Sequence, residues 1–141
     1  MTKTKIVYWL STALLCFIYL GGALAYVTQR PMVEEGFAHF GYPAYLVTVL
    51  IAVKIAGPLA ILSRLSVRLS DLAYAGMLFH LLLAISAHLN AGDTSGFFPA
   101  LLGLALMTTS FLTQNAARKV PSPNVPEVFA RPRTATRQMA S

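Results

Sequence analysis

Charged residues are scarce in this chain of 141 residues. Asp, Glu, Lys and Arg together make up 11% of it, where a soluble domain has roughly 25%. This low proportion excludes an ordinary soluble globular domain. The single cysteine, Cys16, cannot form an intramolecular disulfide, and because it lies within an apolar run we interpret it as a packing residue.

Acidic residues are fewer than basic ones, five against eleven, which gives a net charge of +6. Such a balance is compatible with nucleic-acid binding. The basic residues, however, flank apolar runs and are not interleaved with exposed aromatic residues. The basic residues are therefore predicted to flank membrane-spanning segments. The expected partner of the chain is a lipid bilayer and not a nucleic acid.

Long apolar runs are what the chain has in abundance, with 56% hydrophobic residues. About 20 residues of helix are needed to cross a bilayer, and backbone groups in lipid must be hydrogen-bonded within the segment, so runs of this length are helices. We predict an all-α integral membrane four-helix bundle. Its spans are at about residues 6–26, 45–62, 72–89 and 97–112.

The basic residues are distributed unevenly about these four spans. With an even number of spans both termini share one side of the membrane with the connection between spans two and three. Nine basic residues fall on that side, Arg30 falls on the other, and Lys54 lies within a span. The positive-inside rule then places the N- and C-termini in the cytoplasm. The predicted localisation is the bacterial cytoplasmic (inner) membrane, as a multipass protein.

The connection between spans one and two contains a further helical pattern. Pro31 can begin a helix, Gly41 can end it, and apolar side chains recur between them at helical spacing. We predict a short amphipathic helix on the membrane, with Glu34, Glu35 and His39 on its polar face.

The composition changes after residue 117, where proline, arginine, serine and threonine replace the apolar residues. The sequence therefore predicts a four-transmembrane-helix domain at residues 1–117, followed by a basic, Pro-rich, disordered cytoplasmic tail at 118–141.

Lys54 is the first candidate functional residue, because it lies near the middle of the second span. A lysine there costs about 2.5 to 3.5 kcal/mol on insertion scales. Pro58 removes the helical hydrogen bond to the Lys54 carbonyl, and Gly57 beside it favours a kink. Two interpretations stay open, a structural lysine paired with a carboxylate or with carbonyls, and a functional cation in a polar pocket.

Two histidines, His80 and His88, lie eight residues apart on the third span and share a face with Gly76 and Ala84. Small residues favour helix contacts, so we expect this face to point into the bundle. Each ring either hydrogen-bonds a neighbouring helix or serves a ligand. Without a third ligand of suitable spacing, no metal site is predicted.

Comparable stripes on the other spans are interpreted as packing faces. They comprise Ser11, Leu15, Ile18, Gly22 and Ala25 on the first span and Ala100, Gly103, Met107, Ser110 and Gln114 on the fourth.

Asp93 follows Gly92 in the turn between spans three and four, where an aspartate is either a turn residue or part of a site. We expect a polar pocket reaching from the outer surface to mid-membrane. Its candidate ligand-binding residues are Lys54, His80, His88, Glu34, Glu35, His39 and Asp93, and its candidate catalytic residues are Lys54, His88 and Glu35.

These residues occur within a pattern that resembles the DoxX-like family of small four-helix membrane proteins, over about residues 5–115. The matching features, in order, are Tyr8-Trp9, Glu35-Gly36-Phe37, Gly41-Tyr42-Pro43, Lys54 with Gly57, Tyr74-Ala75-Gly76, and His88 with Gly92-Asp93. The chain departs from the pattern at Ala25, where relatives often carry a lysine.

The resemblance implies a membrane partner of redox enzymes, since the family includes the membrane subunit of a thiosulfate:quinone oxidoreductase and proteins linked to quinone and catechol stress. Our first hypothesis is a protein that binds a lipophilic, quinone-like molecule while a partner protein supplies the redox centre. The second is a membrane enzyme doing acid-base chemistry, such as isomerisation or ring opening, on a hydrophobic substrate. The third is a carrier or non-catalytic scaffold, and a homo-oligomer is a further option for its assembly.

Overall fold

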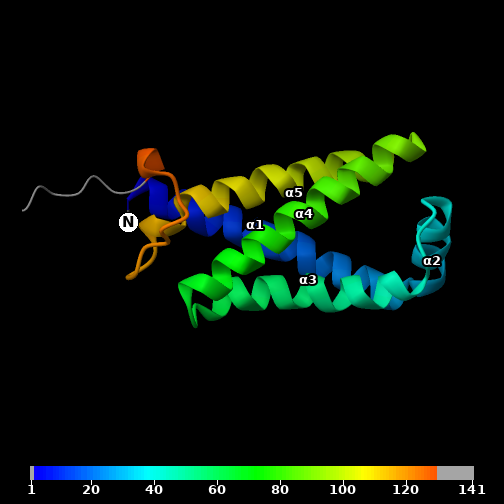
Figure 1. The fold of residues 1–141 in the computed structure, drawn as a ribbon, viewed down its shortest axis with the longest axis horizontal. Coiled ribbons are helices and arrows are strands. Elements are labelled where there is room, and N and C mark those ends of the chain that lie inside the picture. Colours follow the sequence, from blue (N-terminus) through cyan, green and yellow to red (C-terminus); the bar gives the residue numbers. More distant parts are fainter. Residues whose placement is uncertain (1, 130–141) are drawn as a thin grey trace, which may run out of the picture.

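Four long helices form the body of the protein (Figure 1). The computed structural model describes residues 2–129, and its long helices are α1 (Lys3–Thr28), α3 (Tyr45–Ser63), α4 (Val67–Ala91) and α5 (Thr94–Thr113). Each is long and apolar enough to cross a membrane, the last as the continuous segment Thr94–Ala116. The prediction of an all-α bundle with four spans is confirmed.

The four helices form a bundle in which each helix packs against two neighbours. α1 packs against α3 and α5, and α4 packs against the same two helices. Short connections enforce this arrangement. Ser66 begins α4 by accepting a hydrogen bond from the Leu69 amide at 3.0 Å, and Gly92 ends it in a left-handed conformation with φ of 66°.

The short helix α2 (Arg30–His39) lies across one end of the bundle (Figure 1). Pro31 stands at its beginning, and Gly41, with φ of 78°, follows its end. Val33, Phe37 and Phe40 are half-buried against the bundle, while Glu35 and His39 are exposed. The predicted amphipathic helix is therefore confirmed.

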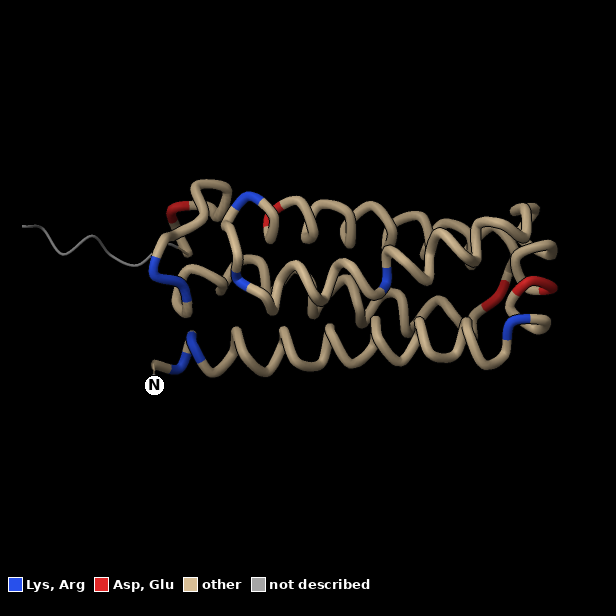
Figure 2. Tube along the Cα trace, turned by 90° about the horizontal axis from the view of Figure 1, so that it is seen from below, with Lys and Arg blue, Asp and Glu red and all other residues tan. Residues whose placement is uncertain are grey.

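The two ends of the bundle differ in charge. Figure 2 shows most Lys and Arg residues, with fewer acidic ones, at the end that carries the N-terminus, which we call the basic end. At the opposite end, which we call the α2 end, acidic residues outnumber basic ones. The asymmetry in the sequence is thus an asymmetry between the two ends of one bundle.

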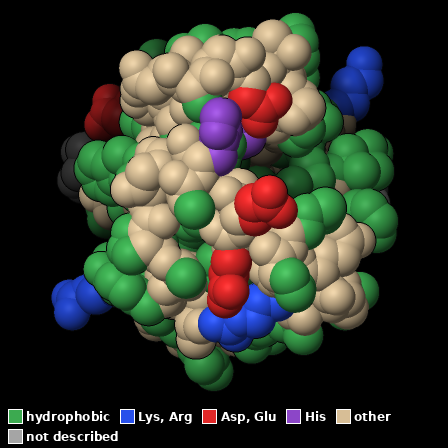
Figure 3. Space-filling view, turned by 90° about the vertical axis from the view of Figure 1, so that its right-hand side faces the viewer, with side chains coloured by type: hydrophobic (Ala, Val, Ile, Leu, Met, Phe, Trp, Pro, Cys, Tyr) green, Lys and Arg blue, Asp and Glu red, His purple; other side chains and the backbone are tan. Residues whose placement is uncertain are grey.

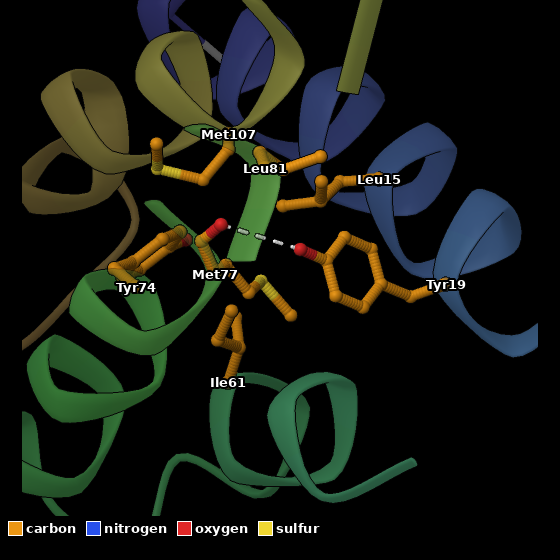
Figure 4. Packing of buried hydrophobic residues seen from close by; sticks show 7 residues of the cluster. All are labelled: Leu15, Tyr19, Ile61, Tyr74, Met77, Leu81 and Met107. Atoms are coloured by element: carbon orange, nitrogen blue, oxygen red, sulfur yellow. Dashed lines mark hydrogen bonds between the residues drawn. The ribbon is translucent and has the colours of Figure 1, made fainter. Parts of the chain in front are cut away.

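The core is apolar with a few polar contacts between helices. Its cluster comprises Leu15, Tyr19, Ile61, Tyr74, Met77, Leu81 and Met107 (Figure 4). Ser110 on α5 lies 2.6 Å from both Thr12 on α1 and Tyr74 on α4, so one hydroxyl joins three helices. Hydrogen bonds of this kind contribute to helix association in lipid, where burial of apolar surface provides little driving force for association.

The expected packing stripe on the fourth span is confirmed, since Ala100, Gly103, Met107, Ser110 and Gln114 are all buried. On α1 the buried stripe is Tyr8, Ser11, Thr12, Leu15, Cys16, Tyr19 and Ala23, so Ile18, Gly22 and Ala25 at the edge of the expected stripe are only half-buried.

The inward face of α4 differs from the expectation. Its buried residues are Ser70, Tyr74, Met77 and Leu81, whereas Gly76 is exposed. Large side chains on this face fill the core, whereas the surroundings of Gly76 are open. His80 and His88 lie beside this face and are half-buried.

The sequence predicts that the four-helix domain ends at residue 117 and a disordered tail follows, whereas the segment after α5 is ordered as far as residue 129 and contacts α4. Two short 3₁₀ turns, η1 (Gln114–Ala116) and η2 (Glu127–Phe129), bound it. Between them Ser122 and Val125 are buried, at 3% and 5% exposure. The polar residues in this segment find partners on α4, which composition alone does not reveal. The rest of the predicted tail, residues 130–141, lies outside the described residues.

Candidate functional site

A cavity of about 320 Å³ lies near the α2 end, between α1, α2, α3 and α4. This volume is at the low end of the range for small-molecule sites. Its lining consists of aliphatic and phenylalanine side chains together with two histidines and two tyrosines. The lining residues are Tyr26, Phe37, Phe40, Tyr42, Leu46, Leu50, His80, Leu83, Ala84, Ala87 and His88.

His80 is held by the core. Its Nδ1 lies 3.0 Å from the Tyr19 hydroxyl, which also lies 3.4 Å from the Met77 carbonyl oxygen. Tyr19 on α1 is 1% exposed, so its packing in the core fixes the position of its ring (Figure 4). Within residues 2–129 the Nε2 atom of His80 has no hydrogen-bond partner. The two ring nitrogens therefore differ, because only Nδ1 is bound to another described residue.

His88 repeats this arrangement closer to the surface. Its Nδ1 lies 2.8 Å from Oδ2 of Asp93, and the described residues give its Nε2 no partner. Hydrogen bonds from the Ser95 side chain and backbone, followed by that from His88, lower the pKa of the Asp93 carboxyl to about 2. Asp93 is therefore an anion at neutral pH and orients the imidazole.

Two further residues fix the His88 ring. Phe40 meets it edge to face, with ring centroids 5.0 Å apart. On the neighbouring helix, Gly96 in the first turn of α5 leaves the space that the ring occupies, because a methyl group at this position would overlap the His88 ring. Glycine here makes room for the histidine, a role that the sequence alone does not indicate.

Lys54 approaches the cavity from α3 without lining it. Its Nζ lies 4.9 Å from the ring centroid of Tyr26, which lines the cavity, and 5.3 Å from that of Tyr19. Neither of the two ion pairs found in residues 2–129 involves Lys54. The cation is therefore stabilised by two aromatic faces, and the paired-carboxylate alternative receives no support. α3 continues past Pro58, which is buried.

The acidic residues of α2 lie outside the cavity. Glu34 pairs with Arg30, with 2.7 Å between Oε1 and Nε. Glu35 and His39 line a neighbouring groove together with Asp93, at the α2 end where Figure 3 shows acidic and histidine side chains on the surface. Phe40 lines both the groove and the cavity and so forms the partition between them.

The expected single pocket is therefore divided. The structure brings His80 and His88 into one cavity, places Lys54 beside it, and puts Glu35, His39 and Asp93 in the groove. Glu34 joins neither lining. Among the described residues no three His, Cys, Asp or Glu side chains are grouped closely enough to hold a metal ion.

Comparison with family profiles yields a match to the DoxX-like family over residues 10–110, most of the four-helix body. The chain belongs to the DoxX-like family. No curated protein and no solved structure matches it. The site of this DoxX-like protein is therefore interpreted from its own geometry.

Several residues of the DoxX-like protein's site were not among the predicted site residues. Tyr19, Tyr26, Phe40 and Gly96 each contact a predicted residue. In the sequence the two tyrosines are aromatic residues within the first apolar run, Phe40 belongs to the connecting helix, and Gly96 directly precedes the fourth span. Only the motif around Phe37 and Tyr42, which flanks Phe40, gave a signal near one of them.

Proposed function

We propose that this membrane protein binds a lipophilic, quinone-like molecule in the cavity near the α2 end and serves a redox process in which a partner protein supplies the redox centre. The observation that carries the proposal is a cavity of about 320 Å³ with a mostly apolar lining that includes two histidines, each bound to the protein through Nδ1. Within residues 2–129 neither Nε2 atom has a hydrogen-bond partner. This volume accommodates a substituted ring, and an isoprenoid tail would extend into lipid.

His80 would act as a hydrogen-bond donor to such a ring. In this proposal the Tyr19 hydroxyl donates to His80 Nδ1 at 3.0 Å and not to the Met77 carbonyl oxygen at 3.4 Å. When Nδ1 accepts, a neutral imidazole carries its proton on Nε2. That N–H group would donate to a ligand carbonyl.

His88 has the opposite character. The Asp93 carboxylate accepts from Nδ1, so the neutral ring presents a lone pair at Nε2 and can hold a proton there beside a compensating anion. Reduction of a quinone takes up two electrons, which the partner would provide, and two protons. His88 lies between the cavity and the polar groove, a position suited to exchanging those protons with water.

Lys54 would contribute a positive charge at mid-membrane. A cation beside the cavity favours a ligand with oxygen atoms that gain negative charge on reduction. Space for this side chain comes from Gly22 on α1, where a methyl group would lie 3.3 Å from Nζ.

The decisive experiment is binding of a short-chain benzoquinone to the purified protein and to a variant with a filled cavity. Ala84→Phe places a ring in the cavity, and Ala75→Phe adds the same ring to the exposed face of the same helix. We expect binding to be lost in the first variant and kept in the second. Equal binding by both variants would refute the cavity as the site.

A second function, acid-base catalysis on a hydrophobic substrate, is favoured by one observation. An imidazole oriented by a carboxylate at 2.8 Å is the usual arrangement of a general base. In this proposal His88 abstracts the proton and Lys54 stabilises a developing oxyanion, while Glu35 would act from the groove. Turnover by the purified protein without any partner would favour it, whereas quinone reduction that requires a partner would favour the first proposal.

A further inference from the structure

The basic end contains a groove of about 680 Å³ that none of the proposed chemistry uses. It lies where the membrane spans end, between the beginning of α1, the connection from α3 to α4, and the segment after η1. The groove is lined by Lys5, Arg64, Leu65, Ser66, Val67, Ala116, Ala117, Arg118, Lys119 and Val120.

Four cations and no acidic residue are among these lining residues. The positive charge is therefore not compensated within the groove. Arg118 donates from Nε to Gln114 at 2.9 Å, but its Nη2 is buried and lacks a hydrogen-bond partner in residues 2–129. A buried donor without an acceptor is costly, and an anion bound here would supply one.

Arg64 is built into the groove. It has a left-handed conformation, with φ of 54°, which is unusual for a residue other than glycine. In this position its guanidinium lies 5.5 Å from the Trp9 ring centroid and donates to the Ala117 carbonyl. The cation is thereby fixed at the level where tryptophan typically meets the membrane interface.

Apolar side chains accompany the cations. Leu65 and Val120 line the groove and are 80% and 67% exposed. A site for a free anion has no need of exposed apolar walls, whereas a phospholipid presents a phosphate with acyl chains beside it. Basic pockets at the ends of membrane helices suit such headgroups.

We propose that this groove binds the phosphate of an anionic phospholipid, with Lys5, Arg64, Arg118 and Lys119 around the headgroup and Leu65 and Val120 against the first acyl carbons. The bound lipid would join three segments distant in sequence and stabilise the basic end of the bundle. The inference is independent of the ligand proposed for the cavity near α2.

The test uses thermal stability of the full chain in detergent while phosphatidylglycerol, phosphatidylcholine or inorganic phosphate is added. Lys5→Gln/Lys119→Gln removes two groove cations whose side chains make no hydrogen bond or ion pair within the described residues. Lys3→Gln/Arg68→Gln removes the same charge from exposed positions at the same end that do not line the groove.

We expect phosphatidylglycerol to raise the melting temperature of the parent and of the control variant, and the groove variant to need about tenfold more of this lipid for the same shift. If both variants needed the same increase in phosphatidylglycerol, the proposal would be overturned. Such a result would show that the lipid is attracted to the general positive charge of the basic end and not to the groove. An equal shift with phosphatidylcholine, or with inorganic phosphate, would also overturn it, because the ligand would then not be an anionic lipid.

Discussion

His88 and Asp93 are joined across the end of α4, with Nδ1 of the imidazole 2.8 Å from Oδ2 of the carboxylate. The left-handed Gly92 turns the chain so that a residue only five positions on reaches back to the helix it has just left. The same carboxylate accepts from the Ser95 amide at 2.8 Å and begins α5. One aspartate therefore both starts a helix and orients the histidine of the cavity.

The pair gives a pH prediction. Because the pKa of Asp93 is lowered to about 2 from an ordinary value of about 4, its contribution to stability is present above pH about 4 and is lost as the pH falls through about 2. Asp93→Asn should therefore melt below the parent at pH 5, and the two melting temperatures should converge as the pH falls from about 4 to about 2. Calorimetry in detergent from pH 5 downward would measure it, and a difference that stayed unchanged down to pH 2 would contradict the assignment.

Gly96→Ala should displace the His88 ring, because a methyl group overlaps it. Losing one hydrogen bond to a ligand weakens binding about tenfold, so we expect quinone affinity to fall by that factor while the helices remain. Gly76→Ala is the matched control, since Gly76 is exposed and has open space around its missing side chain. Equal affinity in the two variants would show that His88 does not contact the ligand.

Lys54→Met should leave the bundle as stable as the parent, or more stable. The substitution removes an insertion cost of about 2.5 to 3.5 kcal/mol and loses two contacts with tyrosine rings, each contributing about 0.5 to 2 kcal/mol, so the gain and the loss are of similar size. Quinone binding should nevertheless fall. Melting temperature and binding measured on one preparation distinguish the roles, and a variant that melts well below the parent yet binds normally would show Lys54 to be structural.

The segment after α5 gives a prediction about stability. The Asp71 carboxylate on α4 accepts from Ser122 Oγ at 2.6 Å and from Asn124 Nδ2 at 2.9 Å, besides Gln114 Nε2. Truncation after residue 120 removes the first two donors, so we expect a loss of about 2 kcal/mol and a melting temperature lower by several degrees. Truncation after residue 129 is the control. If both truncated chains melt like the parent, this segment contributes nothing to the fold.

Orientation in the membrane is testable with single cysteines in a background without Cys16. Leu65 and Val128 at the basic end are 80% and 90% exposed, and Met32 on α2 is 62% exposed. The basic asymmetry predicts that cysteines at the first two positions are labelled from the cytoplasm and that one at Met32 is labelled from outside. Labelling of Leu65 and Met32 from one side would contradict the four-span topology.

The four spans and the helix between the first two could be predicted because both depend on local quantities, the length of an apolar run and the periodicity of residues such as Phe37 and Phe40. His80 and His88 could be named for the same reason, since an eight-residue separation on a helix fixes a common face. Lys54 stood out because an ionisable residue at mid-span is rare.

What the sequence determined by itself was thus the number of spans, the charge difference between the two ends, and the residues whose burial needs an explanation. The tertiary structure decided their partners. That Tyr19 meets His80, that Tyr26 covers Lys54, and that Gly96 makes room for His88 follow from which helices are neighbours and how they are rotated. The same holds for Ser122 on Asp71, where a polar segment is held by hydrogen bonds to a distant helix. Such contacts depend on packing between segments far apart in the chain, which composition and periodicity do not encode.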